Sequence, residues 1–253
     1  MDNVVITVAG KGGVGKTSIS ACIVRELVKT KKNARILAID ADPAVGLATA
    51  LNVEVKYTLD DIRKEIVASG EGDKTKKKAI ELLQESKFRI IDAIVECEGY
   101  NFIAVGRPET AGCYCSVNSY LKDVISLIAN EFDYVVIDGE AGIEQVNRRV
   151  MEDVTHLILV TDQSKKGMGV VKTIKKVADE LVIYKEIGII VNRMYDPSML
   201  EYLDSDGIEI LSCVAEDKGL LICDTKGESI MNLSDDSKLV AGVKEALAKI
   251  IKE

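Results

Sequence analysis

The 253-residue sequence has no tryptophan, three phenylalanines, three prolines and one histidine. No apolar run approaches the roughly 18 residues that a membrane-spanning helix needs, so the sequence predicts no membrane span. Long linkers and internal repeats are also lacking, which predicts one continuous domain over residues 1–253. The chain starts directly with an apolar segment and shows no secretory leader, so we expect a cytoplasmic protein.

Basic residues are too few to balance the acidic ones, because 33 lysines and arginines face 41 aspartates and glutamates, leaving a formal charge of −8. Phosphate contacts need clustered cations, so this balance argues against an anionic membrane surface and predicts no nucleic-acid partner. A mean hydropathy of +0.10 indicates a sheet buried on both faces. Six cysteines in a reducing compartment are expected to be thiols or metal ligands rather than disulfides.

The most informative segment is Gly10-Lys11-Gly12-Gly13-Val14-Gly15-Lys16-Thr17. An apolar run at 4–9 predicts a strand before it, and the pattern of 18–28 predicts a helix after it. A glycine-rich turn there presents backbone N–H groups and the positive helix end to an anion. The spacing of the glycines, lysine and threonine matches the Walker A phosphate-binding loop. A strand-to-helix turn that binds nothing is the alternative.

On the Walker A mechanism, Lys16 reaches the β- and γ-phosphates of ATP and contributes to catalysis, and Thr17 holds Mg²⁺. The remaining nucleotide contacts are expected from Gly12, Gly13, Val14, Gly15 and Ser18.

The octet resembles that of the deviant Walker A ATPases, which include MinD, ParA, the nitrogenase iron protein and the carbon monoxide dehydrogenase accessory protein CooC. Their mark is a second lysine early in the loop, here Lys11. In that family the lysine reaches the nucleotide of the partner subunit. The resemblance therefore implies an ATP-dependent homodimer that hydrolyses ATP, with Lys11 as a catalytic residue.

Carboxylates follow two further predicted strands. The strand at 34–39 precedes Asp40-Ala41-Asp42-Pro43, and the strand at 133–137 ends in Asp138. Carboxyl ends of parallel strands form the edge where ligands bind in open α/β sheets. The resemblance implies that Asp42 orients or deprotonates the attacking water and that Asp40 supports the Mg²⁺ shell. Asp138 would act on Mg²⁺ through its water shell. A turn residue or a helix cap is the non-functional alternative for each.

Two thiols, Cys113 and Cys115, lie in a glycine-flanked loop before a helix expected at 118–131. A helix N-terminus lowers the pKa of a thiol and so favours the thiolate that a metal needs. Two thiolates are half of a four-ligand site, which the same loop of a two-fold partner would complete. Four thiolates suit Zn²⁺ or Ni²⁺. Buried or redox-labile thiols are the alternative.

The Cys113-Tyr114-Cys115 stretch and the run 118–121 after it are similar to the metal-binding loop of CooC-type ATPases. The resemblance implies a metallochaperone that inserts nickel into a client such as carbon monoxide dehydrogenase. A spatial-positioning ATPase of the MinD or ParA type remains an alternative. So does an iron–sulfur electron donor of the nitrogenase type, although the strand at 133–138 lacks the second cluster cysteine of that family.

Asn192 and Arg193 follow a strand predicted at 187–191. In the family an asparagine at this position bonds the adenine, so the resemblance implies that both residues contact the cofactor. A turn residue is the alternative. His156 lacks a nucleophile partner and is expected to be non-catalytic. The cysteines without metal-ligand spacing are expected to be core or incidental thiols: Cys22, Cys97, Cys213 and Cys223.

The alternation of strand and helix patterns predicts an α/β P-loop NTPase fold, a mostly parallel sheet with helices on both faces. Segment 54–98 is expected to be a helical and charged insert of unclear role. The terminal helix predicted at 235–252 has one apolar face, which favours docking on the sheet over the membrane binding known for MinD.

Overall fold

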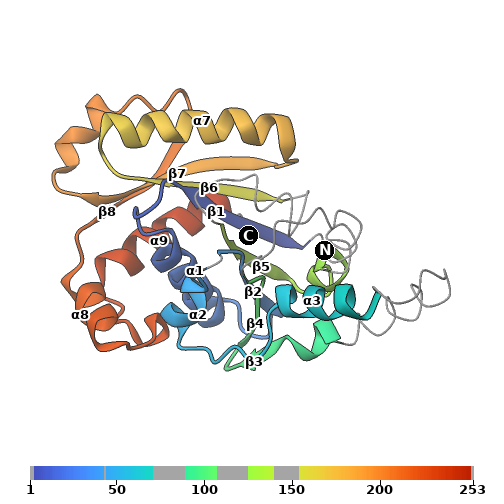
Figure 1. The fold of residues 1–253 in the computed structure, drawn as a ribbon. Coiled ribbons are helices and arrows are strands. Elements are labelled where there is room, and N and C mark those ends of the chain that lie inside the picture. Colours follow the sequence, from blue (N-terminus) through green and yellow to red (C-terminus); the bar gives the residue numbers. More distant parts are fainter. Residues whose placement is uncertain (1–2, 43, 71–88, 107–124, 140–153, 252–253) are drawn as a thin grey trace.

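The computed structural model describes residues 3–42, 44–70, 89–106, 125–139 and 154–251 (Figure 1). Cys113 and Cys115 lie outside the described residues. The strands are β1 (Val4–Gly10), β2 (Ile36–Asp40), β3 (Val95–Cys97), β4 (Tyr100–Ala104), β5 (Tyr134–Asp138), β6 (His156–Thr161), β7 (Glu186–Met194) and β8 (Glu209–Ala215). The helices are α1 (Lys16–Thr30), α2 (Gly46–Leu51), α3 (Leu59–Gly70), α7 (Lys165–Leu181), α8 (Lys218–Lys226) and α9 (Lys238–Ile250), with 3-10 turns η1 (Pro197–Tyr202) and η2 (Ile230–Asn232).

All these strands join one sheet in the order β3-β4-β2-β5-β1-β6-β7-β8. β3 pairs with β4 in the antiparallel sense, and every other pair is parallel. Parallel strands need crossover connections, which place helices on the sheet faces. The predicted α/β class with a mostly parallel sheet is confirmed.

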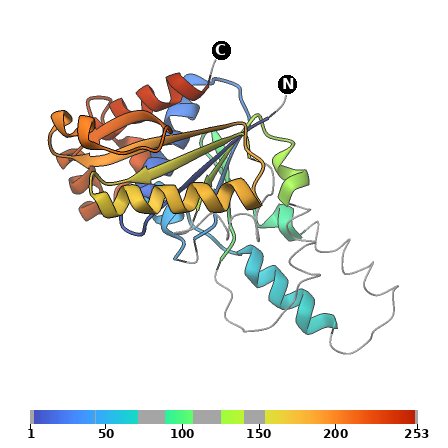
Figure 2. The same ribbon diagram turned by 90° about the horizontal axis from the view of Figure 1, so that it is seen from above.

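Side chains of β1 alternate between two hydrophobic cores. Ile6 and Val8 pack with apolar residues of α1, α2 and α9, whereas Val5 and Ala9 pack with those of α3 and α7. Figure 2 shows the same division, with yellow α7 and cyan α3 on one side of the sheet and red α9 on the other. Because the central strands are covered on both faces, their ends are the accessible part of the sheet.

Among its described residues, segment 54–98 contains helix α3, as expected for a helical insert, and also strand β3. α3 is a core helix, because Leu59 and Ile62 are buried against the sheet. β3 adds an antiparallel edge strand that the sequence did not predict. Its three residues are half-buried or exposed and therefore lack the apolar run that marks the inner strands.

One helix was also not expected from the sequence. α8 was not predicted, since it exposes Leu221 and Ile222 and has no apolar face of helical period. α7 begins at Lys165, where the Ser164 side chain caps it by accepting a hydrogen bond from Gly167 N.

The prediction that the C-terminal helix docks on the sheet is confirmed. Its apolar face is buried, through Leu239, Val240, Val243, Leu247 and Ile250. Within the described ranges, no helix is both long and apolar enough to cross a membrane.

His156 joins the start of β6 to the end of α9. Its Nε2 lies 3.0 Å from the Ile250 carbonyl oxygen, and its Nδ1 lies 2.8 Å from Thr155 Oγ1. A carbonyl only accepts, so Nε2 carries the proton. Burial lowers the pKa of His156, which opposes charging of the ring.

We expect His156 to make stability depend on pH. Because its pKa is lower in the folded state, its contribution is complete above the unfolded value of about 6.5 and is lost as pH falls through the folded value. Urea unfolding of the wild type and His156→Gln between about pH 5 and 8 tests this, since glutamine can still donate to Ile250. The wild type should lose stability relative to the variant as pH falls; a constant difference would contradict the assignment.

Candidate functional site

The glycine-rich loop connects β1 to α1 at the carboxyl edge of the sheet. Gly13 and Gly15 adopt positive φ angles of 78° and 93°, which favour glycine. No side chain in the described part of the chain caps the N-terminus of α1. Its first N–H groups therefore face the loop, where an anion can accept from them. Lys16 is buried there and donates from Nζ to the Lys11 carbonyl oxygen at 3.3 Å.

Strands β6 and β7 hold the glycine-rich loop in place. Gly10 pairs with Val160 of β6, and a Cβ at Gly10 would lie 2.1 Å from the Val160 carbonyl oxygen. Asn192, at the end of β7, donates from Nδ2 to the Val14 carbonyl oxygen at 2.8 Å. A Cβ at Gly15 would lie 2.4 Å from the same Nδ2. Two glycines are therefore required by close approach as well as by backbone conformation.

Asp138 lies fully buried at the end of β5, next to the start of α1. Ser20 Oγ donates to Asp138 Oδ1 at 2.9 Å, whereas Oδ2 has no hydrogen-bond partner among the described residues. Burial raises the pKa of Asp138 to about 6, against hydrogen bonds from Thr17 and Ser20 and the charge of Lys16. A buried carboxylate with an orphaned oxygen, beside two hydroxyl groups, is a set of hard oxygen ligands that fits a divalent cation such as Mg²⁺.

Asp40 ends the neighbouring strand β2 and pairs in register with Asp138. Burial raises its pKa to about 7, although backbone hydrogen bonds oppose this. Its Oδ2 accepts from Leu47 N at 2.9 Å and from Ala48 N at 3.2 Å, and its Oδ1 accepts from Asp42 N at 3.1 Å. Asp40 therefore fixes the segment between β2 and α2.

This bracing role of Asp40 was missed by sequence reasoning. A signal was present, because Val45 precedes α2 and offers no side-chain cap to its N–H groups. A carboxylate from the preceding strand supplies the missing acceptor. Gly46, the first residue of α2, also faces Thr17, since its Cβ position lies 3.6 Å from Thr17 Oγ1. The β2–α2 segment therefore lies next to the end of the phosphate-binding loop.

Asp42 lies half-exposed in this segment. Its Oδ1 accepts from Ala44 N at 2.8 Å, and its charge raises the pKa of Asp138. The structure therefore brings three predicted site carboxylates to one edge of the sheet, around Thr17 and Lys16.

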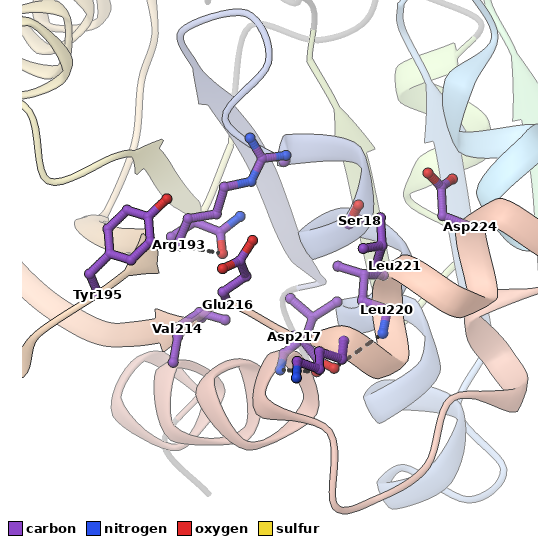
Figure 3. A pocket seen from close by; sticks show the side chains of 14 residues that line it. Ser18, Arg193, Tyr195, Val214, Glu216, Asp217, Leu220, Leu221 and Asp224 are labelled. Atoms are coloured by element: carbon purple, nitrogen blue, oxygen red, sulfur yellow. Dashed lines mark hydrogen bonds between the residues drawn. The ribbon is translucent and has the colours of Figure 1, made fainter.

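A pocket of about 490 Å³ opens beside the start of α1. Asn192 and Arg193, which are the predicted base contacts, line one part of it, and Figure 3 shows Arg193 with Glu216 and Leu221 around the same pocket. Sequence reasoning missed Tyr195, Glu216 and Leu221. Glu216 had a positional signal, since it follows β8 at the same edge of the sheet.

The remaining thiols behave as predicted for core or incidental cysteines. Burial raises the pKa of Cys22 to about 12 and raises those of Cys97, Cys213 and Cys223. Among the described residues, no group of three or more histidine, cysteine or acidic side chains could hold a metal ion. The predicted thiolate pair, Cys113 and Cys115, lies outside those residues.

Comparison with known proteins places the chain among ATP-binding proteins. The model of the family described as an AAA domain, AAA_31, matches residues 3–187. The chain is 37% identical over 251 residues to an uncharacterized ATP-binding protein of Methanocaldococcus jannaschii, covering 98% of each. It is 27% identical over 243 residues to the carbon monoxide dehydrogenase accessory protein CooC of Rhodospirillum rubrum, covering 90% of each.

The structure is similar to that of the septum site-determining protein MinD from Pyrococcus horikoshii, complexed with Mg-ADP. The TM-score is 0.69 at 20% identity, covering 100% of this chain and 97% of that one. A ParA family ATPase from Chlorobium tepidum gives 0.68 at 20% identity, covering 98% and 99%. At this identity the likeness shows the fold.

We expect Gly10→Ala to destabilise the protein by about 2–3 kcal/mol, because its Cβ would meet backbone of a paired central strand that cannot move aside. Gly12→Ala is the matched control, since no described atom lies within 4 Å of its Cβ position. Chemical denaturation of both variants measures the difference. Equal stabilities would show that β1 and β6 can separate at Gly10.

Proposed function

Because the chain belongs to the AAA_31 family, with the fold of the MinD and ParA P-loop ATPases, we propose that it is an ATP-hydrolysing homodimeric metallochaperone. It would hold nickel through Cys113 and Cys115 and help to insert the metal into a carbon monoxide dehydrogenase-like enzyme. The observation that carries the ATPase is the juxtaposition of the glycine-rich loop with the buried carboxylates Asp40 and Asp138.

Different site residues would bind the nucleotide and catalyse its hydrolysis. Backbone N–H groups of residues 12–18 would receive the phosphates, and Lys16 would exchange its bond to the Lys11 carbonyl for the β- and γ-phosphates. Thr17 would hold Mg²⁺, with Asp138 and Asp40 supporting its water shell, and the ion would supply positive charge to the transferred phosphoryl group. Asp42 would orient the attacking water and accept its proton. Asn192 and Arg193 would contact the base.

The β2–α2 segment would respond to the nucleotide state. Asp40 accepts hydrogen bonds from Asp42, Leu47 and Ala48, so a change at the γ-phosphate that moves Asp42 also pulls on α2. Lys11 would close the dimer on the partner's ATP, and closure would bring two cysteine pairs together around one ion. Hydrolysis would then separate the pairs and release nickel to the client.

Two observations support the metallochaperone. The Cys113-x-Cys115 pair supplies soft ligands in a chain otherwise limited to thiols of raised pKa, and a relative along 90% of the chain is a carbon monoxide dehydrogenase accessory protein. Zn²⁺ would suit the same ligands, so the ligand type alone does not select nickel.

A spatial-positioning ATPase is the second candidate, favoured by the MinD-like fold and by MinD relatives such as that of Thermotoga maritima, 24% identical. One observation weighs against binding to a membrane surface through α9. Its apolar face is already buried against the sheet and α1, so it is not available to lipid.

We expect Asp42→Ala to lower the rate of ATP hydrolysis by about 100-fold or more, because it removes the group that accepts the proton of water. ATP binding should change little, since the loop and Lys16 remain. Phosphate release and binding of a fluorescent ATP analogue measure the two effects. Asp196→Ala, at an exposed carboxylate that accepts from Ser198 N, is the control. Full turnover by the Asp42 variant would remove Asp42 from the mechanism.

Equilibrium dialysis against Ni²⁺ or Zn²⁺, with and without ATP, tests the metal site. We expect about one ion per dimer for the wild type and loss of that ion in Cys113→Ala/Cys115→Ala. Cys97→Ala/Cys213→Ala is the matched control, because it removes as many cysteines as the loop variant. It should bind the metal ion as the wild type does. Equal uptake by the loop variant, or none by the wild type, would refute the metallochaperone and leave the positioning ATPase as the better proposal.

A further inference from the structure

Lys11 lies against its own subunit rather than extending away from it. Its Nζ is 3.6 Å from Asp162 Oδ2, and each of the two side chains is 34% exposed. Asp162 directly follows Thr161, the last residue of β6. Because β1 and β6 are parallel, with Gly10 opposite Val160, the segments after both strands leave the sheet at the same edge. The sheet register therefore brings the lysine and the carboxylate together.

The Asp162 carboxylate is fixed by the N-terminus of α7. Its Oδ1 accepts from Ser164 N at 2.9 Å and from the Ser164 hydroxyl, and Ser164 Oγ in turn accepts from Gly167 N at 2.9 Å. A Cβ at Gly167 would lie 2.4 Å from Asp162 Oδ1, so the packing is close. One oxygen is thus engaged in the helix cap, and the other faces Lys11.

Asp162 carries its charge at neutral pH. Partial burial raises its pKa, but hydrogen bonds from Ser164 and the charge of Lys11 outweigh this and hold the pKa below its usual value. The pair is therefore an ion pair between the Lys11 ammonium group and a carboxylate that Ser164 holds in place.

We propose that Asp162 is a positioning residue that retains Lys11 on its own subunit until ATP-driven dimerisation transfers the lysine to the partner's nucleotide. This inference rests on the proposed dimeric ATPase. Moving Lys11 Nζ onto the partner's phosphates would take it away from Asp162, so closing the dimer would break one such pair in each subunit. Asp162 thereby opposes closure of the dimer until ATP binding supplies the free energy that breaks the ion pairs.

The expected size of the effect follows from the exposure of the pair. An ion pair that is one-third exposed shifts an equilibrium by about two- to five-fold, because water competes for both groups. Two pairs break in each dimer, so removal of the carboxylate should strengthen dimerisation by about four- to 25-fold. The Lys11–Asp162 pair, which we call the latch, therefore weakens dimerisation without preventing it.

Sedimentation velocity in Mg²⁺ and a non-hydrolysable ATP analogue tests the proposal. Asp162→Asn keeps an oxygen for Ser164 N and removes the charge, and its dimer dissociation constant should fall by about four- to 25-fold. Lys11→Ala/Asp162→Asn should behave as Lys11→Ala alone, because the carboxylate acts only through the lysine. Asp204→Asn is the matched control, since it breaks an exposed pair with Lys172 of α7, 2.5 Å apart, away from Lys11.

Three other results would each overturn a different part of the proposal. Dimerisation of Asp162→Asn equal to or weaker than that of the wild type overturns the latch, while ATP-dependent dimerisation of the wild type still upholds the proposed function. If neither protein dimerises in the analogue, the dimeric ATPase is wrong and the latch with it. Ser164→Ala loosens the α7 cap but keeps the charge; if it strengthens the dimer equally, the cap and not the ion pair is responsible.

Discussion

Parallel pairing of β1 with β5 and β6 is the constraint on which the whole site depends. Parallel strands end at a common edge, so the phosphate-binding loop, Asp138 and Asp162 meet there although they are far apart in the chain. The pairing is tight enough that Gly10 has no room for a side chain beside Val160. Both faces of these strands are covered by helices, which leaves the edge as the place where a ligand can approach.

The same edge holds groups that folding alone does not favour. Asp40 and Asp138 are buried, and burial raises the pKa of each by desolvating the charged form. Asp138 keeps one oxygen without a described partner. Burying these carboxylates costs stability in the apo protein, and a divalent cation would relieve that cost. Such a conflict between stability and local chemistry is expected at a functional site.

In the proposed function, two contacts would make this edge a switch. Asp40 accepts hydrogen bonds from both Asp42 N and Leu47 N, so it connects the half-exposed residue Asp42 to helix α2. Asp162 ties Lys11 to the cap of α7. Both contacts involve groups that are also assigned to the nucleotide in the proposed function. Binding of ATP would therefore exchange existing internal contacts for new ones, which is how a local ligand biases two arrangements of a fold.

The strength of local patterns decided what could be predicted. The apolar runs of β1 and β6, the spacing from Gly10 to Thr17 and the carboxylates after β2 and β5 are encoded in consecutive residues, so the sequence alone determined the fold class and the phosphate-binding loop. β3 and α8 lack such patterns, because they lie at the edge of the sheet or on its surface and bury little. Contacts between distant segments were decided only by the tertiary structure: Asn192 bracing Val14 and Asp162 holding Lys11. Their partners are set by strand register and sheet order, which no local run of residues specifies.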